Sequence, residues 1–322
     1  MNRLTRRATL GAAAAVALTQ GATAQAWPTR PVRILVPFPA GGIVDIVTRA
    51  LADPMQADLG QTIVVEPKPG GNATLATAMI PQLPADGYNC VMATISHVVA
   101  PLLQSVPYDP LTDFQPVALA TVATAVATVN PSLPVKTLKE LVDYARANPG
   151  KLNYLNPGNG SSLHLSTELL KNEYKLDITT VPYRGVPPGV PDLLEGRLQV
   201  GWLPAPLAIQ HLQSGKLRAL AVLGDKRLAT LPDVPTFAEA GFADVQVISW
   251  YVIAVRAGTP ASIVERLHAS ALKALQDPAT RLTKAGCEVP PPLSPAEILA
   301  MWKADYARYG KLVREAGIKG ES

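Results

Sequence analysis

The chain has 322 residues, of which 48% are hydrophobic, and its formal net charge is +4. This length and composition are sufficient for one large or two ordinary folded domains, which excludes a disordered or fibrous protein. Residues 1–26 hold three of the 29 basic residues and none of the 25 acidic ones, so the rest of the chain has a net charge of only +1. This balance gives no electrostatic basis for nucleic-acid binding.

The first 26 residues predict an export signal. Three arginines precede an apolar run from 8 to 18, and Ala24-Gln25-Ala26 matches the small-x-small pattern of a cleavage site. We expect cleavage after Ala26, with Ala24 as an alternative, by either the general or the twin-arginine route. The apolar run is too short for a permanent membrane helix. The sequence therefore predicts a periplasmic protein without a stable membrane anchor.

Strands and helices alternate along the remaining chain. Hydrophobic periodicity predicts a first set of elements, with strands at 32–36, 62–66 and 88–93 and helices at about 43–55 and 75–81. It predicts a second set with strands at 152–155, 178–181 and 198–202, a helix at 163–171 and a helical stretch ending at Leu194. Each set is a β-α-β-α-β unit, in which helices cover a parallel sheet.

Two apolar runs, 117–129 and 245–255, have the composition of buried strands and are expected to cross between two lobes. Lobe 1 would then regain the C-terminal helices expected at 261–276 and 295–316. The prediction is an α/β fold in which each lobe is a mainly parallel sheet flanked by helices. Lobe 1 comprises residues 27–121 and 251–322, and lobe 2 comprises residues 122–250.

A Pro/Gly-rich turn joins the first strand to the first helix. Its glycines let the backbone turn tightly and approach a ligand closely. A helix that begins there presents free backbone N–H groups and the positive end of its dipole, which together form an anion site. Asp45 either caps this helix or holds a water against the ligand, or it is an ordinary first-turn acid. The predicted ligand-binding residues are Phe38, Pro39, Ala40, Gly41, Gly42 and Asp45.

The second unit contains a comparable turn, whose amide and hydroxyl groups suit a carboxylate. The predicted ligand-binding residues are Asn156, Gly158, Asn159, Gly160, Ser161, Ser162 and His164. Each helix end contributes up to ~2 kcal/mol and each hydrogen bond to a charged group ~1.5–3 kcal/mol. A few such groups reach the ~8 kcal/mol of micromolar affinity. A hydrolase using Ser161, Ser162 or His164 is an alternative, but no orienting acid accompanies these residues.

Further polar residues follow predicted strands at the same sheet edges. Thr94 and Ser96, and less directly His97, come after the strand 88–93, beside the first turn. Tyr183 and Arg184 come after the strand 178–181. Arg184 either pairs with a ligand carboxylate or is a solvated or interlobe ion-pair residue.

The sequence predicts neither a metal nor a cofactor. No two histidines have ligand spacing, and neither turn carries the Gly-Lys-Ser/Thr of a P-loop. The sequence does not decide whether Cys90 and Cys287 form a disulfide, although a buried free thiol at Cys90 is at least as consistent with its place in a strand.

Motifs spread along nearly all of the chain after the export signal resemble one family. In order they are PVRILVPFPAGGIVD at 31–45, PADGY at 84–88, PYDP at 107–110, NPSLP at 130–134, NPGKLNY at 148–154, VPYRG at 181–185, SGKLRALA at 214–221, LPDVPT at 231–236, AGTP at 257–260 and REAG at 314–317. Together they resemble the extracytoplasmic solute receptors of tripartite tricarboxylate transporters, often called Bug receptors.

The resemblance implies a two-lobed periplasmic binding protein fold, type II-like, with two interlobe crossings. It implies that the turns at 38–45 and 156–164 hold a small carboxylate with the help of ordered waters. Where family members often carry acids, this chain has Gln199 and Leu203. We therefore expect a carboxylate without an ammonium group, whose apolar or aromatic body packs near Trp202 and Leu203.

The expected function is that of a monomeric, non-enzymatic receptor that delivers its ligand to the membrane subunits of a tripartite transporter. A receptor that presents the same ligand to a signalling system would have the same site. That alternative and the less favoured hydrolase both stay open at the level of sequence.

Overall fold

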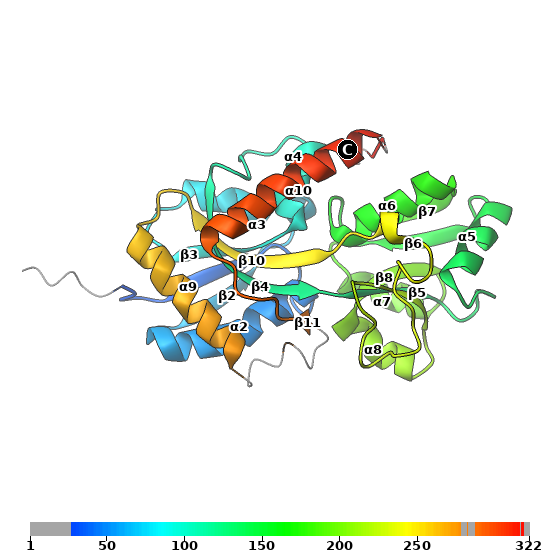
Figure 1. Cartoon of the computed structure of the whole chain (residues 1–322), viewed down its shortest axis with the longest axis horizontal. Coiled ribbons are helices and arrows are strands. Elements are labelled where there is room, and N and C mark those ends of the chain that lie inside the picture. Colours follow the sequence, from blue (N-terminus) through cyan, green and yellow to red (C-terminus); the bar gives the residue numbers. More distant parts are fainter. Residues whose placement is uncertain (1–26, 278–281, 283–286, 316, 319–322) are drawn as a thin grey trace, which may run out of the picture.

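The computed structural model describes residues 27–277, 282, 287–315, 317 and 318, so the predicted export signal lies outside the described residues. The described chain forms two α/β lobes that lie side by side (Figure 1). The first lobe contains a six-stranded sheet of order β11-β4-β10-β3-β1-β2, and the second a five-stranded sheet of order β7-β6-β8-β5-β9. Within the described ranges, no helix combines the length and the apolar character needed to cross a membrane.

The strands confirm most of the expected positions. Those of the first lobe are β1 (Val32–Val36), β2 (Ile63–Pro67), β3 (Asn89–Thr94), β4 (Phe114–Ala123), β10 (Ser249–Arg256) and β11 (Cys287–Glu288). Those of the second lobe are β5 (Ala125–Val129), β6 (Leu152–Asn156), β7 (Ile178–Pro182), β8 (Val200–Pro204) and β9 (Arg218–Leu223).

Both sheets are mixed rather than mainly parallel. Strand β1 is parallel to β2 and β3, and β6 is parallel to β7 and β8. Strand β10 is antiparallel to β3 and β4, and β5 is antiparallel to β8 and β9. The difference arises at the crossings, because a strand that arrives from the other lobe enters the sheet against the direction of its neighbours.

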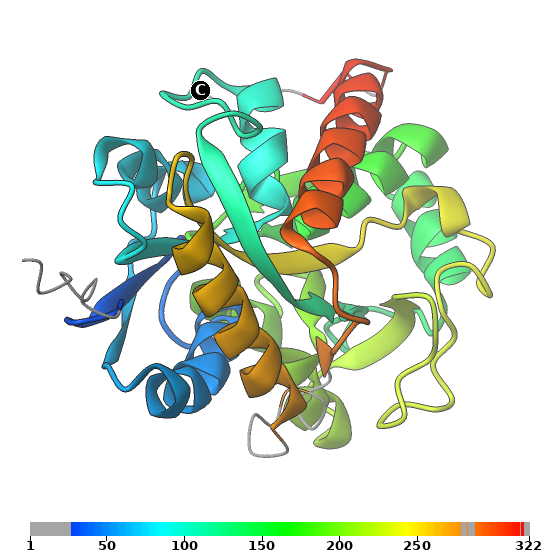
Figure 2. The ribbon, with the colours of Figure 1, turned by 60° about the vertical axis from the view of Figure 1, so that its left-hand side comes forward.

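Helices cover both faces of the first sheet. They are α2 (Ile43–Leu59), α3 (Thr74–Met79), α4 (Ile95–Leu103), α9 (Ala261–Gln276) and α10 (Pro295–Glu315), with the 3₁₀ turns η1 (Gly71–Ala73) and η2 (Ile80–Gln82). One hydrophobic core contains α2 and α9, and another contains α3, α4 and α10. Figure 2 shows α9 and α10 to either side of β4, which both helices contact.

The second lobe has its own hydrophobic core. Its helices are α5 (Leu138–Ala147), α6 (Ser162–Tyr174), α7 (Val190–Leu194) and α8 (Ala205–Gln213), with the 3₁₀ turns η3 (Pro187–Gly189) and η4 (Ala243–Val245).

The alternation of side chains along β1 explains why the first sheet is covered twice. Val32, Ile34 and Val36 pack into the core that contains α2, whereas Leu35 packs into the core that contains α4. Successive residues of a strand point to opposite faces, so a strand with buried apolar side chains on both faces requires a helix layer on each side. This layering places the helix starts at the carboxyl edge of the strands that precede them.

The two lobes are joined by short connections. The chain leaves the first sheet at Ala123 and enters the second at Ala125, so Thr124 alone separates the two strands. It returns to the first sheet at Ser249, after η4. Because so few residues join the sheets, a change of lobe angle has to be absorbed by the backbone at these positions.

The two cysteines are buried and free, which answers the question that the sequence left open. Cys90 lies on β3 and Cys287 on β11, three strand spacings apart in the sheet order. Three spacings amount to about 14 Å, whereas a disulfide requires Cα atoms within about 7 Å.

Candidate functional site

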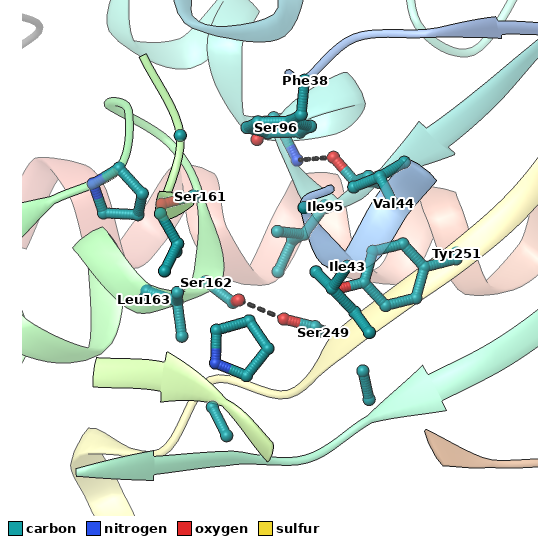
Figure 3. Close-up of a pocket in the computed structure, with 18 of the residues that line it drawn as sticks. Phe38, Ile43, Val44, Ile95, Ser96, Ser161, Ser162, Leu163, Ser249 and Tyr251 are labelled. Atoms are coloured by element: carbon teal, nitrogen blue, oxygen red, sulfur yellow. Dashed lines mark hydrogen bonds between the residues drawn. The ribbon is translucent and has the colours of Figure 1, made fainter. Parts of the chain in front are cut away.

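A cavity lies between the lobes, at the position where the two predicted turns face one another (Figure 3). Seven of the predicted ligand-binding residues line it: Phe38, Pro39, Gly42, Thr94, Ser96, Ser161 and Ser162. Its volume is about 60 Å³. A space of this size is suited to a short ligand.

The start of α2 supplies unpartnered donors to this cavity. Its N-cap position is Gly42, which has no side chain to accept a hydrogen bond, and Ile43 and Val44 follow along the cavity wall. Among the described residues, no acceptor is found for the N–H of Ile43 or Val44. These two groups, together with the helix dipole, form a place for an anionic oxygen.

Two further helices begin at the same cavity, and both are capped by hydroxyl side chains. The Ser96 N–H donates to Thr94 Oγ1 (3.3 Å) at the start of α4, and the His164 N–H donates to Ser161 Oγ (3.2 Å) at the start of α6. A hydroxyl that accepts a capping bond keeps its own proton for another acceptor. Thr94 and Ser161 can therefore cap their helices and donate to a ligand at the same time.

The cavity has no ionisable counter-charge of its own. None of its described lining residues is Asp, Glu, Lys, Arg or His. Most of the wall is apolar, formed by Phe38, Ile43, Val44, Ile95, Leu163 and Val186. An anion bound here would be stabilised by backbone N–H groups, hydroxyls and helix dipoles.

Asp45 supports the first turn and does not line the cavity. Its carboxylate accepts the Gly41 N–H (3.0 Å) and pairs with Arg49 Nε (3.0 Å). Gly41 has φ +78°, a conformation that glycine adopts without strain. Asp45 therefore does not cap α2, and the structure gives it a role that the sequence did not predict, that of a side chain that fixes the turn.

A polar network holds the second turn. Asn156 donates through Nδ2 to Asn159 Oδ1 (2.7 Å) and accepts the Gly158 N–H at Oδ1 (3.0 Å). The Gly160 N–H donates to His164 Nδ1 (3.3 Å). Burial lowers the pKa of His164 to about 4, so its ring is neutral near pH 7. These four predicted residues and His164 shape the turn behind the cavity wall rather than lining it.

The two lobes touch at the edges of the cavity. A Cβ placed on Gly185 of the second lobe would lie 2.8 Å from Pro39 Cδ of the first, so only glycine fits. Asn159 donates its N–H to Asn72 Oδ1 (3.2 Å), which is a hydrogen bond between the lobes. The cavity therefore lies between two opposed edges, which we call the jaws: Pro39 and Asn72 belong to the jaw of the first lobe, and Asn159 and Gly185 to that of the second.

The structure places the remaining predicted residues away from the cavity lining. Trp202 and Leu203 are buried in the core of the second lobe, where Trp202 packs edge-on against Phe237. The expectation that the ligand body packs near Trp202 is not matched by this arrangement. Tyr183 bonds Asp192 through its hydroxyl, and Arg184 is exposed with no ion pair to any described residue. Ala40 is exposed at the outer side of the first turn.

Three polar residues of the cavity escaped the sequence analysis, one of which, Thr124, lies between β4 and β5. Ser249 and Tyr251 lie on β10, the strand that re-enters the first sheet. The hydroxyls of Ser249 and Ser162 share a hydrogen bond (Figure 3). The available signal was a serine and a tyrosine within an otherwise apolar crossing strand. Elsewhere in the described ranges, no group of three or more potential metal ligands is found.

A two-lobed α/β fold with a ligand-sized cavity between the lobes defines a solute-binding protein, a class that closes around a small molecule. The chain belongs to the tripartite tricarboxylate transporter family of receptors. The family model described as "Tripartite tricarboxylate transporter family receptor" matches residues 47–318.

Similar proteins support this membership over nearly the whole chain. Protein BugT of Bordetella pertussis is 33% identical over 316 residues, which cover 97% of this chain and 95% of that protein. The structure of R. palustris Rpa4515 with adipate is 35% identical, with a TM-score of 0.86, covering 92% of this chain and 100% of the other. MatC (Rpa3494) from Rhodopseudomonas palustris with bound malate is 31% identical, with a TM-score of 0.84, covering 89% and 100%.

Proposed function

We propose that this protein is a periplasmic receptor that captures a small carboxylate between its lobes and delivers it to the membrane subunits of a tripartite transporter. The observation that carries the proposal is the uncapped start of α2, which presents the N–H groups of Ile43 and Val44 to a neutral cavity. Two related solute-binding proteins hold the carboxylates adipate and malate, which supports a carboxylate as the ligand here.

We also propose that the protein binds without turnover. The residues of the hydrolase alternative are engaged in other bonds: Ser161 Oγ caps α6, Ser162 bonds Ser249, and His164 Nδ1 accepts a backbone N–H. A serine nucleophile requires a base that accepts its proton, and no hydrogen bond joins the His164 ring to a described serine.

The first experiment identifies what binds. Mass spectrometry of small molecules released from the purified protein, followed by thermal shift and calorimetry against mono- and dicarboxylates, should reveal a stoichiometric carboxylate. At 100 times its dissociation constant, a ligand stabilises the folded protein by ~2.7 kcal/mol. An unchanged melting temperature across the whole panel would contradict the proposed function.

The second experiment tests the role of the helix start. Ile43→Pro removes one N–H from the cavity, and proline is well tolerated at the first position of a helix. The preceding Gly42 has φ −76° and ψ 167°, which a following proline permits. Since a hydrogen bond to a charged group is worth ~1.5–3 kcal/mol, affinity should fall by about 10- to 150-fold.

Ile43→Ala is the matched control, because it removes the same side chain and keeps the N–H. Affinity of the control should stay much closer to that of the parent protein. If both variants lose affinity equally, the loss comes from the side chain, and the helix start is not the anion site.

A further inference from the structure

A groove lies behind the two strands that cross between the lobes, on the face opposite to the ligand cavity. On β10, Ser249 and Tyr251 line the cavity, whereas Trp250, which lies between them, lines the groove. On β4, Ala123 lines the cavity and Val122, which pairs with Trp250, lines the groove. Successive residues of a strand point to opposite faces. The cavity and the groove are therefore separated by the crossing strands.

Both lobes form walls of this groove. Met301, Asp305 and Arg308 line it from α10 in the first lobe, and Asp225 and Ala243 line it from the second. Helix α10 packs into a different core from α2, at whose start the ligand cavity lies. Figure 1 accordingly shows these two helices on opposite sides of β10. A rotation of one lobe against the other therefore changes the width of the groove as well as that of the cavity.

The groove is open in this structure, whereas the lobes touch on the ligand side. Its volume is about 400 Å³, against about 60 Å³ for the ligand cavity. Beside the groove, an exposed ion pair joins Lys226 Nζ of the second lobe to Glu288 Oε1 of the first at 3.8 Å. At the jaws, a Cβ on Gly185 would lie only 2.8 Å from Pro39 Cδ. The lobes therefore have room to approach one another behind the crossing strands, but not at the jaws.

The two crossings are the pivot for such a movement. Thr124 alone separates β4 from β5, and the second crossing enters β10 at Ser249, directly after Ile248, which also lines the groove. Since the pivot lies between the cavity and the groove, a hinge rotation that parts the jaws brings Ala243 towards α10. A group that fills the groove resists this rotation and so lowers the population of the open state.

We propose that the groove behind the crossing strands controls ligand affinity: its free volume allows the jaws to open, and a group that occupies it holds the receptor closed. The apparent dissociation constant rises as the closed fraction of the free protein falls. Filling the groove therefore strengthens ligand binding without any contact with the ligand. This inference goes beyond the proposed function, because it concerns closure and does not depend on which carboxylate is bound.

Ala243→Cys gives a test in which the group is added after folding. Ala243 is exposed and lines the groove, and the two native cysteines are buried, so a thiol reagent modifies the introduced thiol. The purified protein is modified with methyl methanethiosulfonate or with its benzyl counterpart, which differ only in the size of the group they attach. Ala238→Cys, at an exposed position of the same lobe outside the groove, is the matched control.

The benzyl group on the Ala243→Cys protein should raise the affinity for the tightest carboxylate of the panel by at least about fivefold in calorimetry, and the methyl group by less. If the closed state makes up about 1–10% of the free protein, complete closure gives a gain of at most about 100- to 10-fold. Small-angle X-ray scattering without ligand should show a smaller radius of gyration after benzyl modification, closer to that of the ligand-bound protein. Both quantities should stay unchanged in the Ala238→Cys control.

An unchanged radius of gyration, an unchanged or weaker affinity in the benzyl-modified Ala243→Cys protein, or the same gain in the control would overturn the proposal. Scattering separates this test from that of the proposed function. If no carboxylate of the panel binds, the receptor function is refuted, and the radius of gyration alone then decides whether filling the groove closes the lobes.

Discussion

Asn72 offers a direct test of whether contact between the lobes contributes to ligand affinity. Its Oδ1 accepts the Asn159 N–H (3.2 Å) from the second lobe, so this bond exists only while the jaws are closed. Asn72 has φ 55°, in the left-handed region. Asn72→Gly therefore removes the side chain while keeping a residue that adopts this conformation freely.

The expected effect follows from the linkage between closure and binding. A neutral hydrogen bond contributes ~0.5–1.5 kcal/mol net. If ligand binds the closed state, loss of that amount reduces the closed fraction and weakens affinity by about two- to tenfold. The Asn72→Gly protein should show this loss in calorimetry with the tightest carboxylate of the panel. Its melting temperature without ligand should change little, because the lobes fold around separate cores.

Gln104→Ala is the control. Gln104 contacts Asn72 Nδ2 (3.4 Å) and donates to the Gly71 carbonyl (3.2 Å) within the first lobe. It therefore perturbs the same loop without removing the bond between lobes. Unchanged affinity in Asn72→Gly, or an equal loss in both variants, would refute the view that this bond couples closure to binding.

Two further predictions concern buried groups. Cys90 and Cys287 should both remain unreactive towards a thiol reagent in the native protein and give two free thiols after denaturation without reductant. The reasons are that burial raises the pKa of each thiol to about 12 and that the two strands lie too far apart for a disulfide. An intramolecular disulfide found by mass spectrometry would contradict this prediction. The folded-state pKa of His164 is about 4, below its ordinary value of 6.5, so its contribution to stability is full above pH 6.5 and is lost as pH falls towards 4. In this range the free energy of unfolding falls by up to ~1.4 kcal/mol per pH unit. Urea unfolding should therefore show a smaller loss of stability between pH 6.5 and 4.5 for His164→Asn than for the parent protein.

Local patterns in the sequence were enough to predict most of the fold. Strand β1 and helices α2 and α9 have strong periodicity and clear ends, and their positions match closely. Helix α4 was not predicted, because buried apolar residues continue from the end of β3 into the helix and the intervening Thr94, Ser96 and His97 were interpreted as a polar loop after the strand. A short, largely apolar segment does not by its periodicity distinguish a buried strand from a buried helix.

Some residues of the candidate site could likewise be predicted from local sequence, whereas others depend on the tertiary packing. The turn before α2 is encoded by adjacent residues, so its place at the cavity could be predicted from the sequence. Trp202 could not be placed, because β8 is buried on both sides and only the tertiary packing decides which face meets the cavity. Ser249 comes from a strand some 200 residues after the first turn, and only the assembled sheet brings the two together.

The contrast among the three helix starts explains how a neutral cavity can hold an anion. A serine or threonine N-cap stabilises a helix by about 1 kcal/mol relative to alanine and by roughly a few tenths of a kcal/mol relative to glycine. Helices α4 and α6 have such caps in Thr94 and Ser161, whereas α2 begins at Gly42 without one. A ligand oxygen that accepts the N–H groups of Ile43 and Val44 would take the place of the missing cap, so ligand binding stabilises the start of α2. Because no fixed positive side chain is involved, the same arrangement lets the ligand leave when the jaws part.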